Sequence, residues 1–289
     1  MTGIVTELLH VLDLEQVAED SWSGHSPTIG WPRVFGGQVV AQALVAATRT
    51  VPATRPPHSL HAYFLLGGDP KEPIGYEVER IRDGRSFTTR RVVAKQHGRA
   101  IFAMSVSYHD LETGVEHQMP MPDVPAPETL PDSREIAAKA GGAIPSAVLA
   151  YFGRERPIEL RPVEVERYLR RQPQAPRFHV WLRAAAALPD DPAIHRAVLA
   201  YASDMTLLDA TLIAHGQTVF DGLIQSASLD HALWFHQPFR ADDWLLYAQD
   251  SPSAGGARGF ARGMIFTRDG RLVASVAQEG MIRPRRSGA

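Results

Sequence analysis

The stretch Tyr201-Ala-Ser-Asp-Met-Thr-Leu-Leu-Asp-Ala-Thr-Leu-Ile-Ala-His-Gly216 has the spacing of a central amphipathic helix that ends at a glycine. Met205, Leu208 and Leu212 recur at i, i+3 and i+7 and form one apolar stripe. Asp204 lies one turn before Leu208 on that stripe, so its carboxylate is expected to face whatever covers the helix. A buried carboxylate is costly, which makes Asp204 a candidate catalytic residue. The alternative is a helix N-cap, where aspartate is also favoured.

The composition limits the classes of protein that fit. A chain of 289 residues with 44% hydrophobic residues can form one large domain or two ordinary ones. Its 30 basic and 32 acidic side chains nearly balance, so neither a nucleic acid nor an anionic membrane surface is expected as partner. The absence of cysteine excludes disulfides, thiolate metal sites and a cysteine nucleophile. No signal peptide or bilayer-spanning run is apparent, which favours a soluble cytoplasmic protein.

The first half of the chain is predicted to be one helix followed by an antiparallel meander. Val40, Ala43, Leu44 and Ala47 recur at helical spacing after the Gly36-Gly37 turn. The pattern then changes to period two, which is typical of strands separated by tight turns. The predicted strands are residues 58–66, 74–81, 87–96 and 100–108.

A change in composition predicts a domain boundary after this meander. Residues 119–128 are dense in proline, which favours extended structure, and residues 133–140 are predicted to form a short helix beyond them. We therefore expect an N-terminal unit at residues 1–112, a proline-rich linker at 113–155 and a C-terminal unit at 156–289.

The second half repeats the element order of the first. Two pairs of segments echo each other at a separation of roughly 170 residues, as an internal duplication would produce. The pairs are Ser59–Phe64 with Ser228–Phe235, and Gly98–Ala103 with Gly270–Ala274. The predicted strands are residues 156–164, 178–186, 224–236, 244–249, 259–267 and 272–278. The expected fold is α+β, with two tandem hotdog folds, each a central helix wrapped by a curved antiparallel sheet.

Several motifs then give a more specific resemblance, which covers residues 8–283. The chain resembles the TesB-type acyl-CoA thioesterase II family in its segments RVFGGQVV (33–40), YASD (201–204), DHALWFH (230–236), ARGF (257–260) and VAQEG (276–280). The resemblance implies hydrolysis of acyl-CoA to a free fatty acid and coenzyme A. It implies no cofactor, and a homodimer or larger homo-oligomer.

The catalytic residues that the resemblance implies are Asp204, Ser228 and Gln278, which together hold and activate a water without a covalent intermediate. Threonine is more usual at the position of Ser228. Period two places Gln278 where a core residue is expected, whereas the matching position in the first half is Val106. This difference predicts that only the second half kept a site. The alternatives are an ordinary strand hydroxyl for Ser228 and a strand-end amide for Gln278.

Four further residues are candidates for substrate binding. A backbone N–H of Gly36 or Gly37, or of the start of the Asp204 helix, could stabilise an oxyanion. Arg258 and Arg262 lie four apart on one strand face and could bind coenzyme A phosphates, with solvated surface arginines as the alternative. The histidine spacing predicts no metal site.

Other functions compete with this hypothesis. A hotdog enoyl-CoA hydratase would need a histidine close to the aspartate, and the nearest in sequence is His215. A non-catalytic acyl-CoA-binding module is the alternative outside enzymes. A hydrolase triad of Ser228, Asp230 and His231 is not expected, because His231 points to the other face of a strand.

Overall fold

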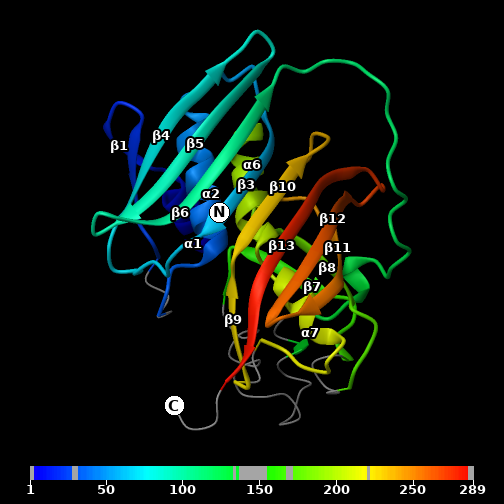
Figure 1. Cartoon of the computed structure of the whole chain (residues 1–289). Helices are drawn as coiled ribbons and strands as arrows, with labels where there is room; N and C mark the ends of the chain where they lie inside the picture. Colours follow the sequence, from blue (N-terminus) through cyan, green and yellow to red (C-terminus); the bar gives the residue numbers. More distant parts are fainter. Residues whose placement is uncertain are drawn as a thin grey trace.

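The computed structural model describes residues 3–27, 32–132, 135–136, 155–166, 172–219 and 222–285. Its strands form one antiparallel sheet in the order β1-β2-β4-β5-β6-β3-β10-β13-β12-β11-β8-β7, with β9 paired to β13 (Figure 1). First-half elements are α1 (Gly3–Leu12), β1 (Glu15–Ala18), β2 (Ser21–Gly24), α2 (Gly36–Thr48), β3 (Pro57–Phe64), β4 (Ile74–Asp83), β5 (Phe87–Gln96) and β6 (Arg99–His109). The predicted strands and helix of this half are confirmed to within a few residues at their ends.

The second half supplies the other edge of the sheet. Its elements are β7 (Ile158–Pro162), β8 (Arg177–Ala184), α6 (Pro192–Ser203), the 3₁₀ turn η2 (Leu207–Asp209), α7 (Ala210–Ile213), β9 (Ile224–Ser228), β10 (Asp230–Phe235), β11 (Leu245–Gly255), β12 (Arg258–Thr267) and β13 (Leu272–Pro284). The two halves join where β3 pairs with β10, from Asp230 opposite Tyr63 to Trp234 opposite Ser59. Both halves therefore share one continuous sheet.

The helices α2 and α6 lie together on the inner face of this sheet (Figure 1). Four alanines of α2 are fully buried, and such small side chains let the second helix approach closely. A single apolar core contains residues of both helices, including Val40 and Leu44 of α2 and Val198 and Leu199 of α6. Each of these four aliphatic side chains contributes about 1.5–3 kcal/mol on full burial.

The prediction of one helix over residues 201–216 is wrong. The helix α6 begins at Pro192, where the Asp191 side chain accepts a hydrogen bond from the Ala193 N–H, and it ends at Ser203. Asp204 is the C-cap of this helix, so the N-cap interpretation of Asp204 is wrong as well. Thr206 then adopts a left-handed conformation, with φ of 66°, which no continuing helix allows.

The predicted single strand over residues 224–236 is in fact two strands. Leu229 separates β9 from β10: its N–H donates to the Glu279 carbonyl, and its own carbonyl accepts from the Phe64 N–H. This interruption shifts the register against β13 by one residue. Ser228 is thereby placed at the end of β9.

The proline-rich segment crosses the outer face of the second half (Figure 1). Residues 110–126 belong to no helix or strand, and the 3₁₀ turn η1 (Pro127–Thr129) follows them. The Trp181 indole N–H donates to the Pro125 carbonyl at 2.9 Å. Met121 and Val124 pack on the apolar cluster around Trp181. Most of the helix predicted at residues 133–140 lies outside the described residues, and the division into units at 112 and 156 stays a prediction.

Candidate active site

Asp204 lies where the C-terminal end of α6 packs beside the N-terminal end of α2. It caps the C-terminus of α6, and its Oδ2 lies against Gly36 in the first turn of α2. The N-terminus of α2 carries a partial positive charge, which favours an anion at this position. The site is therefore built by both halves of the chain, with the acid from the second half and the helix N-terminus from the first.

The Asp204 carboxylate accepts hydrogen bonds from three separate elements. The Gln278 amide on β13 donates to Oδ1 at 2.7 Å, and the Ser228 hydroxyl at the end of β9 lies 3.4 Å from the same oxygen. The third donor is the backbone N–H of Gly37. The structure thus brings together all three residues that were predicted to be catalytic. The Ser228 contact is long, and the Gln278 contact is the better hydrogen bond.

The environment of Asp204 shifts its proton affinity. Burial raises the pKa of Asp204 to about 6, although the hydrogen bonds from Gln278, Gly37 and Ser228 act in the opposite direction. A carboxylate with this pKa is ionised at neutral pH and is a stronger base than an exposed aspartate. The arrangement suits an acceptor of a proton from a neutral nucleophile.

A cavity of about 690 Å³ opens beside the carboxylate. Asp204, Ser228 and Gly36 lie on its wall, whereas Gln278 does not line it. Gln278 is buried behind Asp204, and its Oε1 has no hydrogen-bond partner among the described residues. The remaining lining is largely apolar and includes Val34, Phe35, Phe64, Leu65, Leu66, Ile101, Phe102, Met205 and Leu208. The cavity has room for an apolar chain with its reactive end at Asp204.

The two glycines at the start of α2 are sterically required. A Cβ on Gly36 would lie 2.7 Å from Asp204 Oδ2 and 3.0 Å from the Phe64 ring. A Cβ on Gly37 would overlap the Tyr201 carbonyl in the last turn of α6. Gly36 lines the cavity, and the Gly37 N–H is directed at Asp204.

Buried polar residues hold the turn that carries Asp204, and no sequence pattern predicted this role for them. The Tyr247 hydroxyl donates to the Ser203 carbonyl at 2.9 Å, and His231 Nε2 lies 2.9 Å from the Ser203 hydroxyl. Burial lowers the pKa of His231 to about 4, so this imidazole is neutral at physiological pH. His231 therefore supports the helix end, and it has no contact with Ser228 of the kind a triad would need.

A further amide fixes the left-handed turn after Asp204. Gln249 of β11 is buried and donates from Nε2 to the Thr206 hydroxyl at 2.6 Å. A β-branched residue in this conformation costs of order 1 kcal/mol or more unless neighbouring groups hold it. Gln249 thus stabilises the backbone that aims Asp204 at the cavity.

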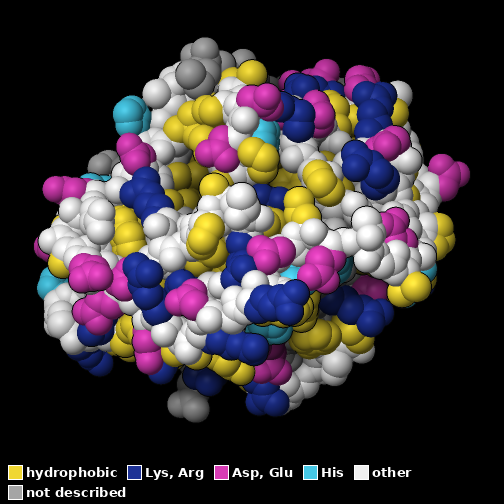
Figure 2. Space-filling model, turned by 90° about the horizontal axis from the view of Figure 1, so that it is seen from above, with side chains coloured by type: hydrophobic (Ala, Val, Ile, Leu, Met, Phe, Trp, Pro, Cys, Tyr) yellow, Lys and Arg dark blue, Asp and Glu magenta, His cyan; other side chains and the backbone are white. Residues whose placement is uncertain are grey.

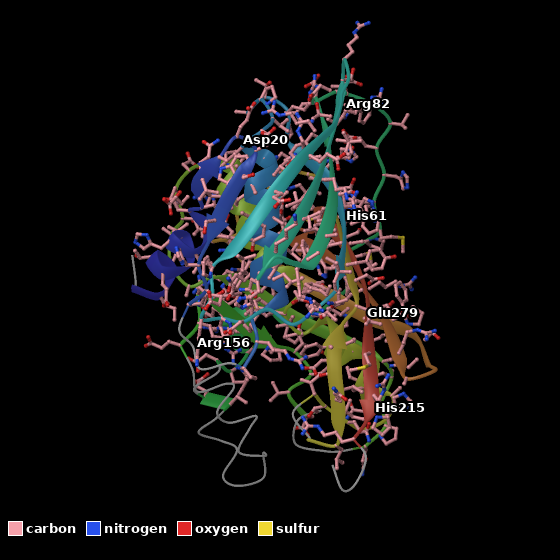
Figure 3. The ribbon with its side chains drawn as sticks, turned by 60° about the vertical axis from the view of Figure 1, so that its left-hand side comes forward. Asp20, His61, Arg82, Arg156, His215 and Glu279 are labelled. Carbon is pink, nitrogen blue, oxygen red and sulfur yellow. The ribbon has the colours of Figure 1, made fainter. Side chains whose placement is uncertain are left out.

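The structure does not bring Arg258 and Arg262 to this cavity. Arg258 pairs with Glu279 at 3.0 Å, and Arg262 pairs with Asp250 at 2.7 Å; both arginines are exposed on β12. The cations that do line the cavity are Arg33 and Arg156. Figure 3 shows Arg156 and Glu279 on opposite sides of the ribbon.

His215 is also remote from the site. It lies in the exposed turn after α7 and is not part of the cavity wall. Figure 3 shows it near the lower end of the sheet, below Glu279. The arrangement lacks the adjacent aspartate and histidine that the hydratase hypothesis requires.

Other classes of site find little support in the part of the chain that the structure describes. There, no three His, Asp or Glu side chains are grouped so that they could hold a metal ion. None of the described helices is long and apolar enough to cross a bilayer. On the face shown in Figure 2, acidic and basic side chains are interspersed, without a large region of one sign.

Comparison with known proteins finds similar sequences over nearly the whole chain. A family model described as acyl-CoA thioesterase matches residues 148–281, and one described as acyl-CoA thioesterase N-terminal domain matches residues 22–109. Acyl-CoA thioesterase 2 of Haemophilus influenzae is 38% identical over 283 residues, covering 98% of this chain and 99% of that protein.

Solved structures show the same similarity. The acyl-CoA thioesterase II TesB2 of Mycobacterium marinum superposes with a TM-score of 0.79 and 42% identity, over 98% of this chain and 99% of that one. A protein of unknown function from Alicyclobacillus acidocaldarius with a hot dog fold reaches the same TM-score at 17% identity, over 97% and 99% of the two chains. The predicted hotdog architecture is therefore confirmed.

Proposed function

The chain belongs to the acyl-CoA thioesterase family and is a thioester hydrolase, and we propose that Asp204 is the general base of its reaction, which yields a free fatty acid and coenzyme A. The observation that carries this proposal is the enclosed carboxylate at the wall of the cavity, held by donors from β13, β9 and α2. A positioned base with a raised pKa can activate water, because a thioester carbonyl is electrophilic and its thiolate leaves readily.

The proposed reaction needs no covalent intermediate. Asp204 takes a proton from a water molecule while the water oxygen forms a bond to the thioester carbon. The carbonyl π electrons move to its oxygen, and return when the carbon–sulfur bond breaks. The departing thiolate of coenzyme A then takes the proton from the Asp204 carboxyl, which restores the carboxylate. Atoms and charge balance as one acyl-CoA and one water giving one fatty acid and one thiol.

Ser228 and Gln278 receive different roles in this proposal. Ser228 lines the cavity and can orient the attacking water through its hydroxyl. Gln278 lies behind Asp204 and fixes the carboxylate through Oδ1, so that it acts as a positioning residue. The other carboxylate oxygen, Oδ2, lies against Gly36. Holding the base in one orientation reduces the entropy that the transition state must lose.

The first turn of α2 is proposed to stabilise the oxyanion. Gly36 lines the cavity next to Asp204, and backbone N–H groups at a helix N-terminus attract developing negative charge. The acyl chain would lie along the apolar wall that includes Phe64 and Phe102. Arg33 and Arg156 on the same wall would attract the phosphates of coenzyme A.

The test is release of free thiol from a short, a medium and a long saturated acyl-CoA. Release from at least one of them supports hydrolysis, and the series ranks the chain lengths. A short enoyl-CoA, followed by loss of its conjugated absorbance, tests hydration in parallel. Binding of acyl-CoA without release of thiol would instead favour the binding module.

The rate of hydrolysis is expected to fall on the acidic side of about pH 6. Asp204 acts as the carboxylate, and its pKa is raised to about 6, so a growing fraction is protonated and inactive below that pH. The measurement is kcat/KM for one acyl-CoA from about pH 5 to about pH 8, with unfolding followed at each pH to exclude loss of protein. A profile that stays flat through this range would contradict the assignment of Asp204.

Gln278→Leu is expected to move this acidic limb to higher pH and to slow the reaction roughly tenfold to a hundredfold. The Gln278 hydrogen bond lowers the pKa of Asp204, whereas burial raises it. Loss of this hydrogen bond is therefore expected to raise the pKa of Asp204 further. The pH profile separates this positioning role from a general loss of stability, which would lower the rate without moving the midpoint. A slower variant with an unmoved midpoint would count against the role.

A further inference from the structure

A second cavity, of about 570 Å³, lies at the opposite end of the central helix pair. The first cavity contacts the N-terminus of α2 and the C-terminus of α6; the second contacts the C-terminus of α2, at Thr48 and Arg49, and the N-terminus of α6, at Asp191 and Ala193. The two helices are therefore antiparallel, and the second cavity is the counterpart of the first under exchange of the two halves.

Under this exchange an arginine takes the place of the Asp204 carboxylate. Arg49 is the C-cap of α2, as Asp204 is the C-cap of α6. On the strand side, Pro57 at the start of β3 lines the second cavity, whereas Ser228 next to β10 lines the first. The second cavity thus lies at the corresponding position between the helices. It has Arg49 where the first cavity has Asp204, and Pro57 where the first cavity has Ser228.

Arg196 adds a second cation to this wall, and the charge of Asp191 acts on it without a direct contact. It is half-buried, and no hydrogen bond or ion pair joins its guanidinium to any described residue. The nearby Asp191 is occupied as the cap of α6, accepting from the Ala193 N–H at 2.8 Å. By contrast, Arg49 already pairs with Asp13 at 2.8 Å and donates to the Leu14 carbonyl. A half-buried guanidinium that no acid contacts directly is costly unless an anion meets it.

Two acids also line this wall, but Asp13 is paired with Arg49 and Asp191 caps α6. Thr6, His10 and Thr48 are the other polar side chains on it, and the remaining lining residues are apolar. Leu9 and Leu12 come from α1, Leu44 and Val45 from α2, and Ile194 and Ala197 from α6. The volume falls within the range of small-molecule sites, about 300–1,000 Å³. A ligand that fits must therefore combine one anionic group with an apolar chain. A planar carboxylate matches the fork of a guanidinium with two parallel hydrogen bonds.

We propose that the second cavity binds a free fatty acid, with its carboxylate on Arg196 and its chain between α1, α2 and α6. The site is separate from the one at Asp204 and has Arg49 at the position that corresponds to that carboxylate, so it is expected to hold the acid without acting on it. The inference does not require Asp204 to be catalytic, since it rests on residues at the other end of the helices.

The test is calorimetric titration of the full chain with decanoate. Arg196→Met removes the charge but keeps a long apolar side chain, and Ala193→Phe fills the cavity from an exposed position on its wall. Arg99→Met is the matched control, because Arg99 is exposed and lines neither cavity. Wild type and Arg99→Met are expected to show one more decanoate site than Arg196→Met and Ala193→Phe. If a cavity variant keeps binding in the second cavity, its affinity there is expected to be at least about tenfold weaker than that of the wild type.

Two further measurements separate the second cavity from the first. Thiol release from decanoyl-CoA is expected to be the same in all four proteins, because Arg196 and Ala193 are far from Asp204 along α6. Decanol, which lacks the charge, is expected to bind the second cavity at least about tenfold more weakly than decanoate. Equal decanoate binding in all four proteins, or equal binding of decanol and decanoate, would overturn the proposal.

Discussion

Replacing Asp204 with asparagine is expected to reduce kcat for thioester hydrolysis by at least roughly a hundredfold in a chain that stays folded. An amide has nearly the shape of the carboxylate but cannot accept a proton from water. Its oxygen can still receive the Gly37 N–H, and Gln278 can turn its amide so that Oε1 accepts from the new NH₂ group. The measurement is thiol release at saturating acyl-CoA, with the wild type alongside.

The same substitution is expected to stabilise the fold at neutral pH, by up to about 3 kcal/mol. The pKa of Asp204 rises from 3.8 in the unfolded chain to about 6 in the folded one, so the folded state holds the proton more tightly. Ionisation of Asp204 therefore lowers the free energy of unfolding. This destabilisation is absent below about pH 3.8, grows between about pH 3.8 and about pH 6, and is complete above about pH 6. Urea unfolding near pH 7 and near pH 4.5 should therefore show a gain that shrinks in acid.

Asp250→Asn is the matched control for both measurements. Asp250 pairs with Arg262 on β12, and neither residue lines the catalytic cavity. Its substitution should leave kcat unchanged and move stability by less than about 1 kcal/mol. Near wild-type turnover in a folded Asp204→Asn variant would remove Asp204 from the mechanism.

Local pattern predicted most of the fold correctly. Periodicity and turn residues are local properties, and they located α2 and the strands of the meander. The predicted helix over 201–216 is wrong because the chain does not stay helical along its apolar stripe. Leu212 is buried and Met205 and Leu208 line the cavity, yet the chain turns left-handed at Thr206. That turn is held by Gln249, which lies on a strand much later in the sequence.

The candidate site was predictable only in part for a similar reason. Motif resemblance identified Asp204, Ser228 and Gln278, and the structure brings them together. The contribution of the first half to the same carboxylate, through Gly37, depends on how α2 and α6 pack. The sequences of α2 and α6, taken separately, do not predict this packing.

The ion pairs of Arg258 and Arg262 could not be predicted from spacing along the chain. Spacing correctly placed Arg258 and Arg262 on one strand, but it could not identify the acids beside them. Glu279 and Asp250 lie on the two neighbouring strands, and the register of the sheet brings each one next to its arginine. Two cations that appeared available for phosphates are thus already paired at the surface.

Gly37→Ala is expected to lower both stability and activity, although alanine is the better helix former. The propensity of alanine would favour α2 by up to about 1 kcal/mol. Against this, the added methyl group would overlap the Tyr201 carbonyl, which is backbone and cannot move aside without shifting the end of α6. Forcing such an overlap in a packed interior costs about 1–3 kcal/mol, so the clash outweighs the propensity.

The activity should fall further than stability alone would explain, by roughly a hundredfold. Separating the helix ends moves the Gly37 N–H away from Asp204, and it displaces the base relative to Ser228. Gly75→Ala is the control, because a Cβ there has the Lys95 carbonyl at 3.9 Å as its nearest neighbour. Urea unfolding and thiol release on both variants decide the matter. If Gly37→Ala matched the wild type in both, the close approach of α2 and α6 could not be what positions Asp204.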